Sequence, residues 1–599
     1  MMKVVESLRN KLEGLIKATD RYPLTLLFLL AAATVNVMAI NHDMEDYSNY
    51  LFTFIIGALL SAVGQQIYER FFTKTSERLI TMGVAILLAS FYYFIIRSAS
   101  VFSMENGTKT AVMIFALTLV FIWAPTIRSK ITFNESFMST FKAFFTTVLF
   151  TMVISGGVSL IIFATDSLLF DVNIKAIPHT LNLIISLFAP IFFLSFTPFY
   201  PGKMDEGLTK EELIEREENL KKAISCPKNL GILISYIIIP LTAVFTIILL
   251  VYLLVNIRGA FWTENLLEPM LVSYSITVIL VYILASSIEN QFANIFRKIF
   301  PKVLVPIVLF QTIASFMKIG DLGLTHGRYY VILYGVFALI AGLIFSFLPI
   351  KKNGLIAAVL IVFSAISIIP PIDAFTVSRV NHMNLLEKTL VENDMLKDNT
   401  VVPNDSISIE EKIIITRTAS YLNNMNYTDD IDWLPKKVFF YDNFKKTFGF
   451  EPVYDYQNSG GMNSQYAYLD WRQNPVLSVE GHDFMVHLDI NSQADSNVQE
   501  ILLEKSGESY TLTKQREGDY FTISVKNKAG EELIHFDTND IFNHVFDNED
   551  EAFKGNMMTP DQATITKENE QVKMSILINS VDSYNKHYNA DFYVFIGIK

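Results

Sequence analysis

The chain has 599 residues, of which 51% are hydrophobic and 18% are charged, and its formal net charge is −12 at pH 7. This negative balance is opposite in sign to the basic footprint of nucleic-acid-binding proteins, so no nucleic-acid partner is expected. The average hides a division near Asp373. Apolar runs fill residues 22–371, whereas residues 372–599 are polar and acidic. This division predicts one part in a lipid bilayer and another in water.

The apolar part contains segments long enough to cross a membrane, since a helix needs about 20 mostly apolar residues to span about 30 Å of hydrocarbon. We predict an α-helical polytopic membrane bundle of about eleven transmembrane helices, with ten to twelve as the range. The fourth, ninth and eleventh segments are the shortest. The predicted spans are Tyr22–Ile40, Leu51–Tyr68, Leu79–Ile96, Thr110–Ala124, Phe141–Thr165, His179–Phe199, Asn229–Val255, Met270–Ser287, Lys302–Met317, Tyr329–Leu348 and Gly354–Pro370.

Lys and Arg in the connecting loops predict the orientation, because cytoplasmic loops retain positive charge. With the N-terminus in the cytoplasm, the cytoplasmic segments hold 21 Lys and Arg residues and the opposite loops hold six. An odd number of spans then exports the C-terminal part. The single cysteine, Cys226, falls in the longest cytoplasmic loop, so the exported part has no disulfide, which suits a bacterial surface. We therefore predict a multi-pass protein of the bacterial cell (inner) membrane.

Two helices are expected on the cytoplasmic side. Residues 1–21 carry apolar positions at helical spacing together with basic residues, which predicts an interfacial helix on the inner leaflet. Docking of this helix on the cytoplasmic ends of the other helices is the alternative. In the long inner loop, Thr209 and Glu212 have the spacing of a capping box and predict a charged helix through about Lys222. It serves as a solvated connector or, alternatively, docks a partner.

The C-terminal part divides into a stalk and a β-rich domain. In residues 372–459, Ala374–Leu396 continues as a helical stalk, and Ser408 with Glu411 caps a second helix. Residues 460–599 alternate with a period of two, which predicts an extracytoplasmic α+β domain with a mostly antiparallel, β-sandwich-like sheet of six to nine strands. A short helix is expected near 539–545. The apolar strand positions are Phe484, Val486, Leu488, Ile490, Phe521, Ile523, Val525, Met574, Ile576, Ile578, Tyr593, Phe595 and Ile598.

The strongest candidate ligand site spans the end of the ninth helix and the start of the tenth. Gln311 lies within the span, and Lys318, Asp321, Thr325 and Arg328 follow at the outer turn. Ionisable groups in a membrane cost about 2.5–3.5 kcal/mol on insertion scales and are therefore often functional. In the alternative reading the two cations reach the interface, the Asp neutralises them, and Gln311 bonds a neighbouring helix.

Other polar residues have weaker functional readings. Asp483, His487 and Asp489 would share a strand face and could hold a metal, but a solvent-facing strand gives the same pattern, so no metal or cofactor is expected. Asp166 could pair with Lys318 or Arg328, although a water-facing position at the interface explains it more simply. Asn36 in the first span is interpreted as a helix-to-helix contact.

An ordered set of phrases along the chain resembles the bacterial polytopic membrane proteins grouped as the domain-of-unknown-function family numbered four-one-five-three. The resemblance runs from about Tyr22 to beyond Leu396 and is expected to extend into the tail. It implies a multi-span region, bacterial origin and, in variants with this kind of C-terminus, an extracytoplasmic domain. It supplies no substrate and no catalytic residue. The phrases are Gly156-Gly157, Leu160-Ile161-Ile162, Leu169-Phe170, Ala189-Pro190-Ile191-Phe192-Phe193-Leu194, Ile239-Pro240-Leu241, Phe300-Pro301, Gly323-Leu324-Thr325, Arg328-Tyr329, Ser378-Arg379 and Asn393-Asp394-Met395-Leu396.

The sequence lacks the usual signatures of enzymes, including a Walker lysine motif, Gly-x-Ser-x-Gly, His-Glu-x-x-His and Cys-x-x-Cys. The leading hypothesis is a non-enzymatic envelope protein that binds, scaffolds or senses. Its partners would be the lipid bilayer and an envelope or membrane protein bound through residues 400–599. A secondary transporter or lipid-handling protein is the second hypothesis. A membrane-embedded transferase acting on envelope polymers is the third.

Overall fold

The structure is a computed structural model. It describes residues 13–42, 47–97, 103–256, 267–317, 323–435, 443–453, 464–469, 476–491, 498–517, 520–546, 557–584 and 587–599, together with the single positions 319, 438 and 471.

Eleven helical segments of the described residues are long and apolar enough to cross a membrane, between Pro23 and Ile368. They coincide with the eleven predicted spans, including the three shortest, so the polytopic bundle is confirmed. The helices are α2 (Pro23–His42), α3 (Tyr47–Phe71), α4 (Thr75–Ile96), α5 (Met104–Trp123), α6 (Phe133–Leu168), α7 (Ala176–Leu183), α8 (Ala189–Ser195), α9 (Lys210–Ile224), α10 (Lys228–Leu233), α11 (Ile239–Asn256), α12 (Leu267–Leu284), α13 (Gln291–Met317), α15 (His326–Phe347) and α16 (Gly354–Ile368).

Two of the spans contain a single π-helical turn, η2 (Ile184–Phe188) between α7 and α8 and η4 (Ile234–Ile238) between α10 and α11. Each turn ends two residues before a proline, Pro190 or Pro240. Proline has no N–H to donate to the preceding turn, and a wider π turn is one way in which a helix adjusts its hydrogen bonds around such a gap. The position of each π-helical turn is therefore explained by the proline that follows it in the sequence.

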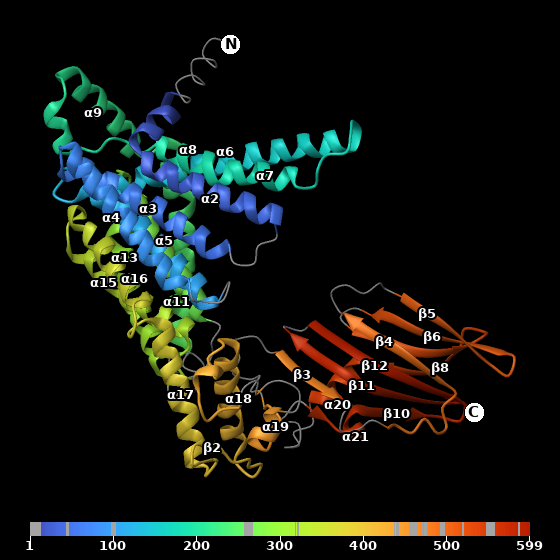
Figure 1. Ribbon diagram of the computed structural model, residues 1–599. Helices are drawn as coiled ribbons and strands as arrows, with labels where there is room; N and C mark the ends of the chain where they lie inside the picture. Colours follow the sequence, from blue (N-terminus) through green and yellow to red (C-terminus); the bar gives the residue numbers. More distant parts are fainter. Residues whose placement is uncertain are drawn as a thin grey trace.

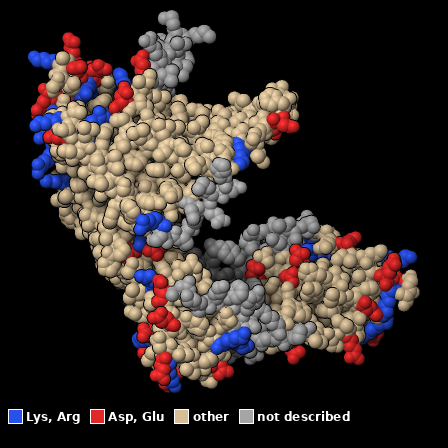
Figure 2. All heavy atoms as spheres, viewed as in Figure 1, with Lys and Arg blue, Asp and Glu red and all other residues tan. Residues whose placement is uncertain are grey.

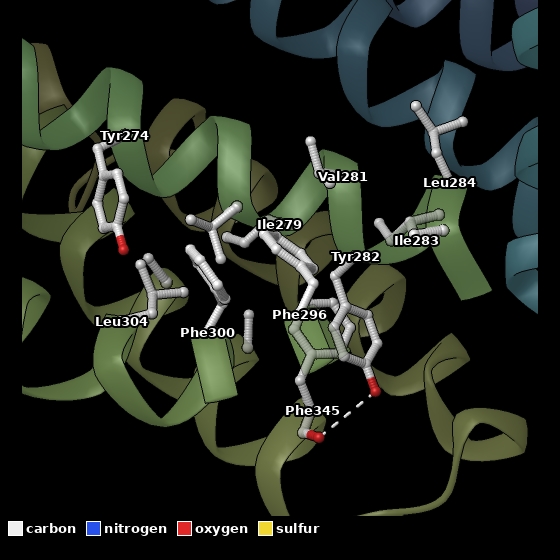
Figure 3. Packing of buried hydrophobic residues seen from close by; sticks show 14 of the residues in the cluster. Tyr274, Ile279, Val281, Tyr282, Ile283, Leu284, Phe296, Phe300, Leu304 and Phe345 are labelled. Atoms are coloured by element: carbon white, nitrogen blue, oxygen red, sulfur yellow. Dashed lines mark hydrogen bonds between the residues drawn. The ribbon is translucent and has the colours of Figure 1, made fainter. Parts of the chain in front are cut away.

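The bundle core is built from aromatic and branched side chains of α12, α13, α15 and α16. Phe296 and Phe300 stack with ring centroids 4.3 Å apart, and Tyr282 stacks on Phe345 at 3.8 Å. Figure 3 shows these rings packed together, with the Tyr282 hydroxyl donating to the Phe345 carbonyl at 3.4 Å. Small residues allow close helix approach elsewhere, since Gly342 lies against Val305 and the Pro301 carbonyl.

The helices do not form one parallel layer. The α6–α7 hairpin extends past the other helices, and α9 lies at the opposite end of the bundle from the chain that follows α16 (Figure 1). Large apolar side chains on α6, such as Leu149, Val153 and Leu160, are exposed. The surface in Figure 2 is largely uncharged across the helices, and Lys, Arg, Asp and Glu gather near α9 and beyond the far end. An apolar belt between charged ends is the pattern of a surface that contacts lipid.

The segment before the first span packs into the bundle. Residues 13–21 are helical, and Ala18 and Tyr22 are buried beside Ala62, Phe121 and Leu194. This packing corresponds to the docking alternative for the N-terminal helix. The rest of that prediction, residues 1–12, lies outside the described residues. The capped helix predicted in the inner loop is α9. The Thr209 hydroxyl accepts from the Glu212 N–H, and the Glu212 carboxylate accepts from the Thr209 N–H.

The stalk is α17 (Ala374–Glu392), and the second predicted helix is α18 (Ile409–Asn424), which begins with the predicted Ser408–Glu411 capping box. They pack with α19 (Asn443–Phe448) around a separate core that includes Leu386, Leu390 and Phe448. A two-stranded hairpin, β1 (Leu396–Lys397) with β2 (Thr400–Val401), joins them. The stalk is therefore a small helical unit with its own apolar interior.

The β-rich part contains two sheets. One has the order β4-β12-β11-β3-β9 with β10 beside β11, and the other has the order β5-β6-β7-β8. All pairings are antiparallel except the short β3–β9 pair. The elements are β3 (Ser464–Leu469), β4 (Phe484–Asn491), β5 (Val498–Lys505), β6 (Glu508–Glu517), β7 (Tyr520–Asn527), β8 (Glu532–Asp537), α20 (Thr538–Phe546), β9 (Met557–Met558), α21 (Pro560–Ala563), β10 (Thr564–Glu568), β11 (Val572–Tyr584) and β12 (His587–Ile598).

Both sheets contribute to one core, as in a sandwich, and α20 lies at the predicted helix position. The predicted apolar positions of β7 and β11, including Ile523 and Ile576, are buried, but burial in β11 does not alternate, because residues 574–578 are all buried. Two predictions are wrong. The described residues hold ten strands here, because polar strands such as β6 and two-residue strands such as β9 lack a clear period. In β12 the most buried face carries Phe592, Val594 and Ile596, since these side chains belong to the core shared by the two sheets, whereas Tyr593 is only partly buried on the other face.

Candidate functional site

Three residues of the predicted site can be placed in the structure. Gln311 lies on α13 and is 3% exposed, and its Nε2 has no hydrogen-bond partner among the described residues. Thr325 is the N-cap of α15 and accepts from the Arg328 N–H at 3.3 Å. The Arg328 guanidinium donates to the Gly323 carbonyl at 2.8 Å. Lys318 and Asp321 lie outside the described residues. The end of the loop before α15 is thus a helix N-cap. The ligand-binding role of these residues stays a prediction.

The structure places an aromatic and histidine cluster at this same turn, which the sequence analysis did not find. His326 at the start of α15 contacts the Tyr421 hydroxyl of α18 at 3.0 Å through Nδ1. His382 of α17 stacks on the Tyr421 ring with centroids 3.9 Å apart, and Phe375 stacks on His326 at 5.0 Å. Helices α15, α17 and α18 therefore meet at Tyr421. We call this contact, with the ionic group below, the junction.

The ionic group of the junction connects α5 to the stalk. Asp373 has a fully buried side chain that caps α17 and pairs with Lys109 at 3.0 Å. Lys109 also pairs with Glu105 at 2.7 Å, one helical turn before it. Glu105 in turn accepts from the Tyr427 hydroxyl at 2.8 Å. Lys109 thus contacts both the Glu105 and the Asp373 carboxylates, and the Tyr427 hydroxyl contacts Glu105.

The electrostatics of the junction fit these contacts. Burial alone would raise the pKa of Asp373, but hydrogen bonds from Thr376 and Lys109 hold it below its usual value. Burial and the neighbouring Glu105 carboxylate raise the pKa of Tyr427, so the phenol stays protonated and can donate. Arg379 adds an exposed pair with Asp430 at 2.9 Å. Of these contacts, the Glu105–Lys109 ion pair has a signal in the sequence, because the two residues are four positions apart, which is the spacing of neighbours on a helix.

The buried histidine predicts a pH dependence of the stalk. Burial lowers the pKa of His382 to about 4, with the nearby Arg417, Arg328 and His326 acting in the same direction. The unfolded chain binds the proton near its ordinary value of about 6.5. The contribution of the neutral His382 ring to the free energy of unfolding is therefore fully present above about pH 6.5. It decreases by up to about 3 kcal/mol as the pH falls towards 4. We expect protease cleavage of the stalk to rise from pH 7 to 5 in the wild type, and His382→Phe to remove this dependence. Equal pH profiles would contradict the assignment.

The candidate metal ligands of the tail are paired with other groups. Asp483 contacts Lys505 at 2.7 Å, and His487 contacts Asp591 at 2.8 Å on the exposed face of the sheet. Among the described residues, no group of three or more His, Cys, Asp or Glu side chains could hold a metal ion. Asp483, His487 and Asp489 are all exposed, and His487 and Asp489 share one face of β4, as predicted.

The β-rich part has a polar cavity of about 520 Å³. His482 Nε2 lies 3.1 Å from the Ser575 hydroxyl, which also contacts the Thr566 hydroxyl at 2.8 Å. Ser575 is only 5% exposed and lies within strand β11. A nucleophile must reach its substrate, so this pair is better read as an internal hydrogen-bond network. Lys573 and Phe595 also line the cavity, where they can contact a ligand.

Two further polar residues can be placed. Asp166 lies near the tip of the α6–α7 hairpin, where it is exposed and accepts from the Val172 N–H at 2.7 Å. This arrangement agrees with the interfacial reading. Asn36 donates to Asn182 at 3.1 Å, which joins α2 to α7 and confirms the interpretation of Asn36 as a helix-to-helix contact.

Comparisons with known proteins identify the membrane part. Residues 28–406 match the family described as "Domain of unknown function (DUF4153)". The match ends before α18, so the expected extension of the resemblance through the tail is not supported beyond residue 406. No curated protein and no solved structure matches the chain. Because the match covers more than half of the sequence and the apolar helices are those of a multi-pass membrane protein, the chain belongs to the DUF4153 family.

Proposed function

We propose that the protein is a non-enzymatic envelope protein of the bacterial cell membrane, whose exported C-terminal domain binds a partner and whose bundle anchors and senses that domain. The observation that carries the proposal is the junction. A domain that only needed a tether could be joined by a flexible linker. Here the stalk is instead fixed to α5 by the Lys109–Asp373 ion pair and the Tyr427–Glu105 hydrogen bond. It is fixed to α15 by the contacts of His326 with Tyr421 and Phe375. Such a connection can transmit a displacement of the stalk to the helices.

The partner surface is proposed to lie within residues 400–599. The cavity beside His482 offers hydroxyl groups and the Lys573 ammonium next to an aromatic ring. Groups of this kind bind polar or anionic envelope components. The test is a chain truncated after residue 399, compared with the full chain in native membranes. The truncated chain should insert normally but lose both its crosslinked partner and its envelope phenotype. An unchanged phenotype would count against the proposal.

The proposed orientation places the N-terminus and α9 in the cytoplasm and the β-rich domain outside. It is supported by the Lys and Arg distribution and by the position of α9 and the stalk at opposite ends of the bundle (Figure 1). The single native cysteine makes the test direct. In a Cys226→Ser background, an impermeant maleimide should label Ala529→Cys in intact cells. The matched variant Lys221→Cys, on α9, should be labelled only after permeabilisation. Labelling in the reverse order would invert the orientation.

A secondary transporter or lipid-handling protein is the second candidate. It is favoured by Gln311, whose buried amide Nε2 has no hydrogen-bond partner among the described residues and is costly inside a membrane. In this candidate, Lys318, Asp321, Thr325 and Arg328 would form the outer part of the site. Neutralising the three charged residues should abolish activity while membrane insertion is retained. Silent substitutions would exclude the site.

A further inference from the structure

A second cavity lies at the other end of the bundle from the junction. It has a volume of about 310 Å³ and is formed by three elements: the helical segment 13–21, the residues that end and follow α8, and α9. The spans on either side begin at Pro23 and end at Ser195. The cavity is therefore placed just beyond two span ends, where headgroups meet water.

The lining of the cavity combines cations with apolar walls. Lys17, Arg21 and Arg216 line it, whereas Asp and Glu are absent from its lining in the described part of the chain. Both guanidinium groups lie against the Phe199 ring, at 3.9 Å for Arg21 and 4.4 Å for Arg216. Asn219 adds an amide that can donate hydrogen bonds. The site thus offers positive charge beside an apolar surface.

The charge balance favours a singly charged anion. Glu69 engages Arg21 through two hydrogen bonds, and Asp205 pairs with Arg216 at 2.8 Å. Neither acid lines the cavity. Lys17 adds one further positive charge from the exposed side of its helix. Since Arg21 and Arg216 each already face an acid, Lys17 is the lining cation that would pair with a singly charged phosphodiester.

We propose that this cavity binds a phosphate ester at the membrane surface. A phospholipid headgroup fits the apolar walls of Leu194 and Phe199, and basic pockets beside transmembrane helices are known to bind anionic headgroups. A soluble phosphate compound has the same recognition chemistry and is the other source. The site is separate from the junction and does not depend on the function proposed for it.

The test is native mass spectrometry of the purified full chain in detergent with three probes: phosphatidylglycerol, phosphatidylcholine and inorganic phosphate. We expect phosphatidylglycerol to be retained more strongly than neutral phosphatidylcholine. The double variant Lys17→Gln/Arg216→Gln should lose about fivefold in affinity for each removed charge. The matched control Lys210→Gln/Lys221→Gln removes two exposed charges of α9 outside the cavity and should bind as the wild type does.

A steric variant separates binding from electrostatics. A Cβ added at Gly14 would meet Ser195 only at 4.0 Å, so Gly14→Leu fills the cavity without a backbone clash and should reduce binding with no change in charge. Displacement of the lipid by millimolar inorganic phosphate would support the phosphate site and assign it to a soluble compound. Wild-type binding by both the double and the steric variants, or equal retention of phosphatidylcholine, would overturn the proposal.

Discussion

Replacement of Arg21 by methionine is expected to destabilise the bundle by about 3–5 kcal/mol. The guanidinium and the Glu69 carboxylate are 6% and 9% exposed, and they share two hydrogen bonds of 2.9 and 2.7 Å. Arg21 also donates to the Thr197 and Pro198 carbonyls. Among the described residues, the variant leaves the Glu69 carboxylate, which is 9% exposed, with the Gln65 amide as its remaining hydrogen-bond donor. The free energy of unfolding in detergent micelles measures the effect.

A double variant tests the cause. Arg21→Met/Glu69→Leu removes both charges and should recover most of the lost stability, because an apolar pair has no uncompensated charge to bury. Lys221→Met is the matched control, since its pair with Glu217 is 71% and 67% exposed, and it should change stability by less than about 0.5 kcal/mol. A single variant as stable as the control would show that the carboxylate reaches water.

Replacement of Lys109 by methionine is expected to release the stalk from the bundle, at a cost of about 3 kcal/mol. Lys109 is the cation between Glu105 and the fully buried Asp373. Without it, two carboxylates face each other across the boundary of α5 and α17. Hydrogen exchange and protease cleavage in α17 and α18 should rise, while the spans stay protected. Loss of protection confined to the stalk would identify the junction as a separate unit of stability.

The charge dependence of this effect can be isolated. Asp373→Asn keeps a helix-capping side chain, so Lys109→Met/Asp373→Asn should restore much of the protection. Lys388→Met on the exposed face of α17 is the control, because its pair with Glu392 is 69% and 63% exposed. Equal exchange in the Lys109 and Lys388 variants would contradict a structural role of the junction.

The eleven spans, the capped starts of α9 and α18, and the helix α20 followed from the sequence, because each depends on interactions within a few residues. Length and apolar composition decide whether a segment crosses lipid, and a capping box is complete within four residues, as in Ser408 and Glu411. The strand count and the buried face of β12 did not follow. They depend on neighbours in the sheet, which a local period cannot identify.

The candidate sites divide in the same way. The sequence singled out the turn around Thr325 and Arg328 by charge, and the structure shows Thr325 as a helix cap there. Tyr421 of α18 contacts His326 at this turn, and nothing in the local sequence indicates that contact. Glu105 and Tyr427 are 322 residues apart and meet only because α17 and α18 fold back on the bundle. The sequence by itself determined which segments enter the membrane, whereas tertiary structure decided which charges pair, because burial makes an unpaired charge costly only after the helices have packed.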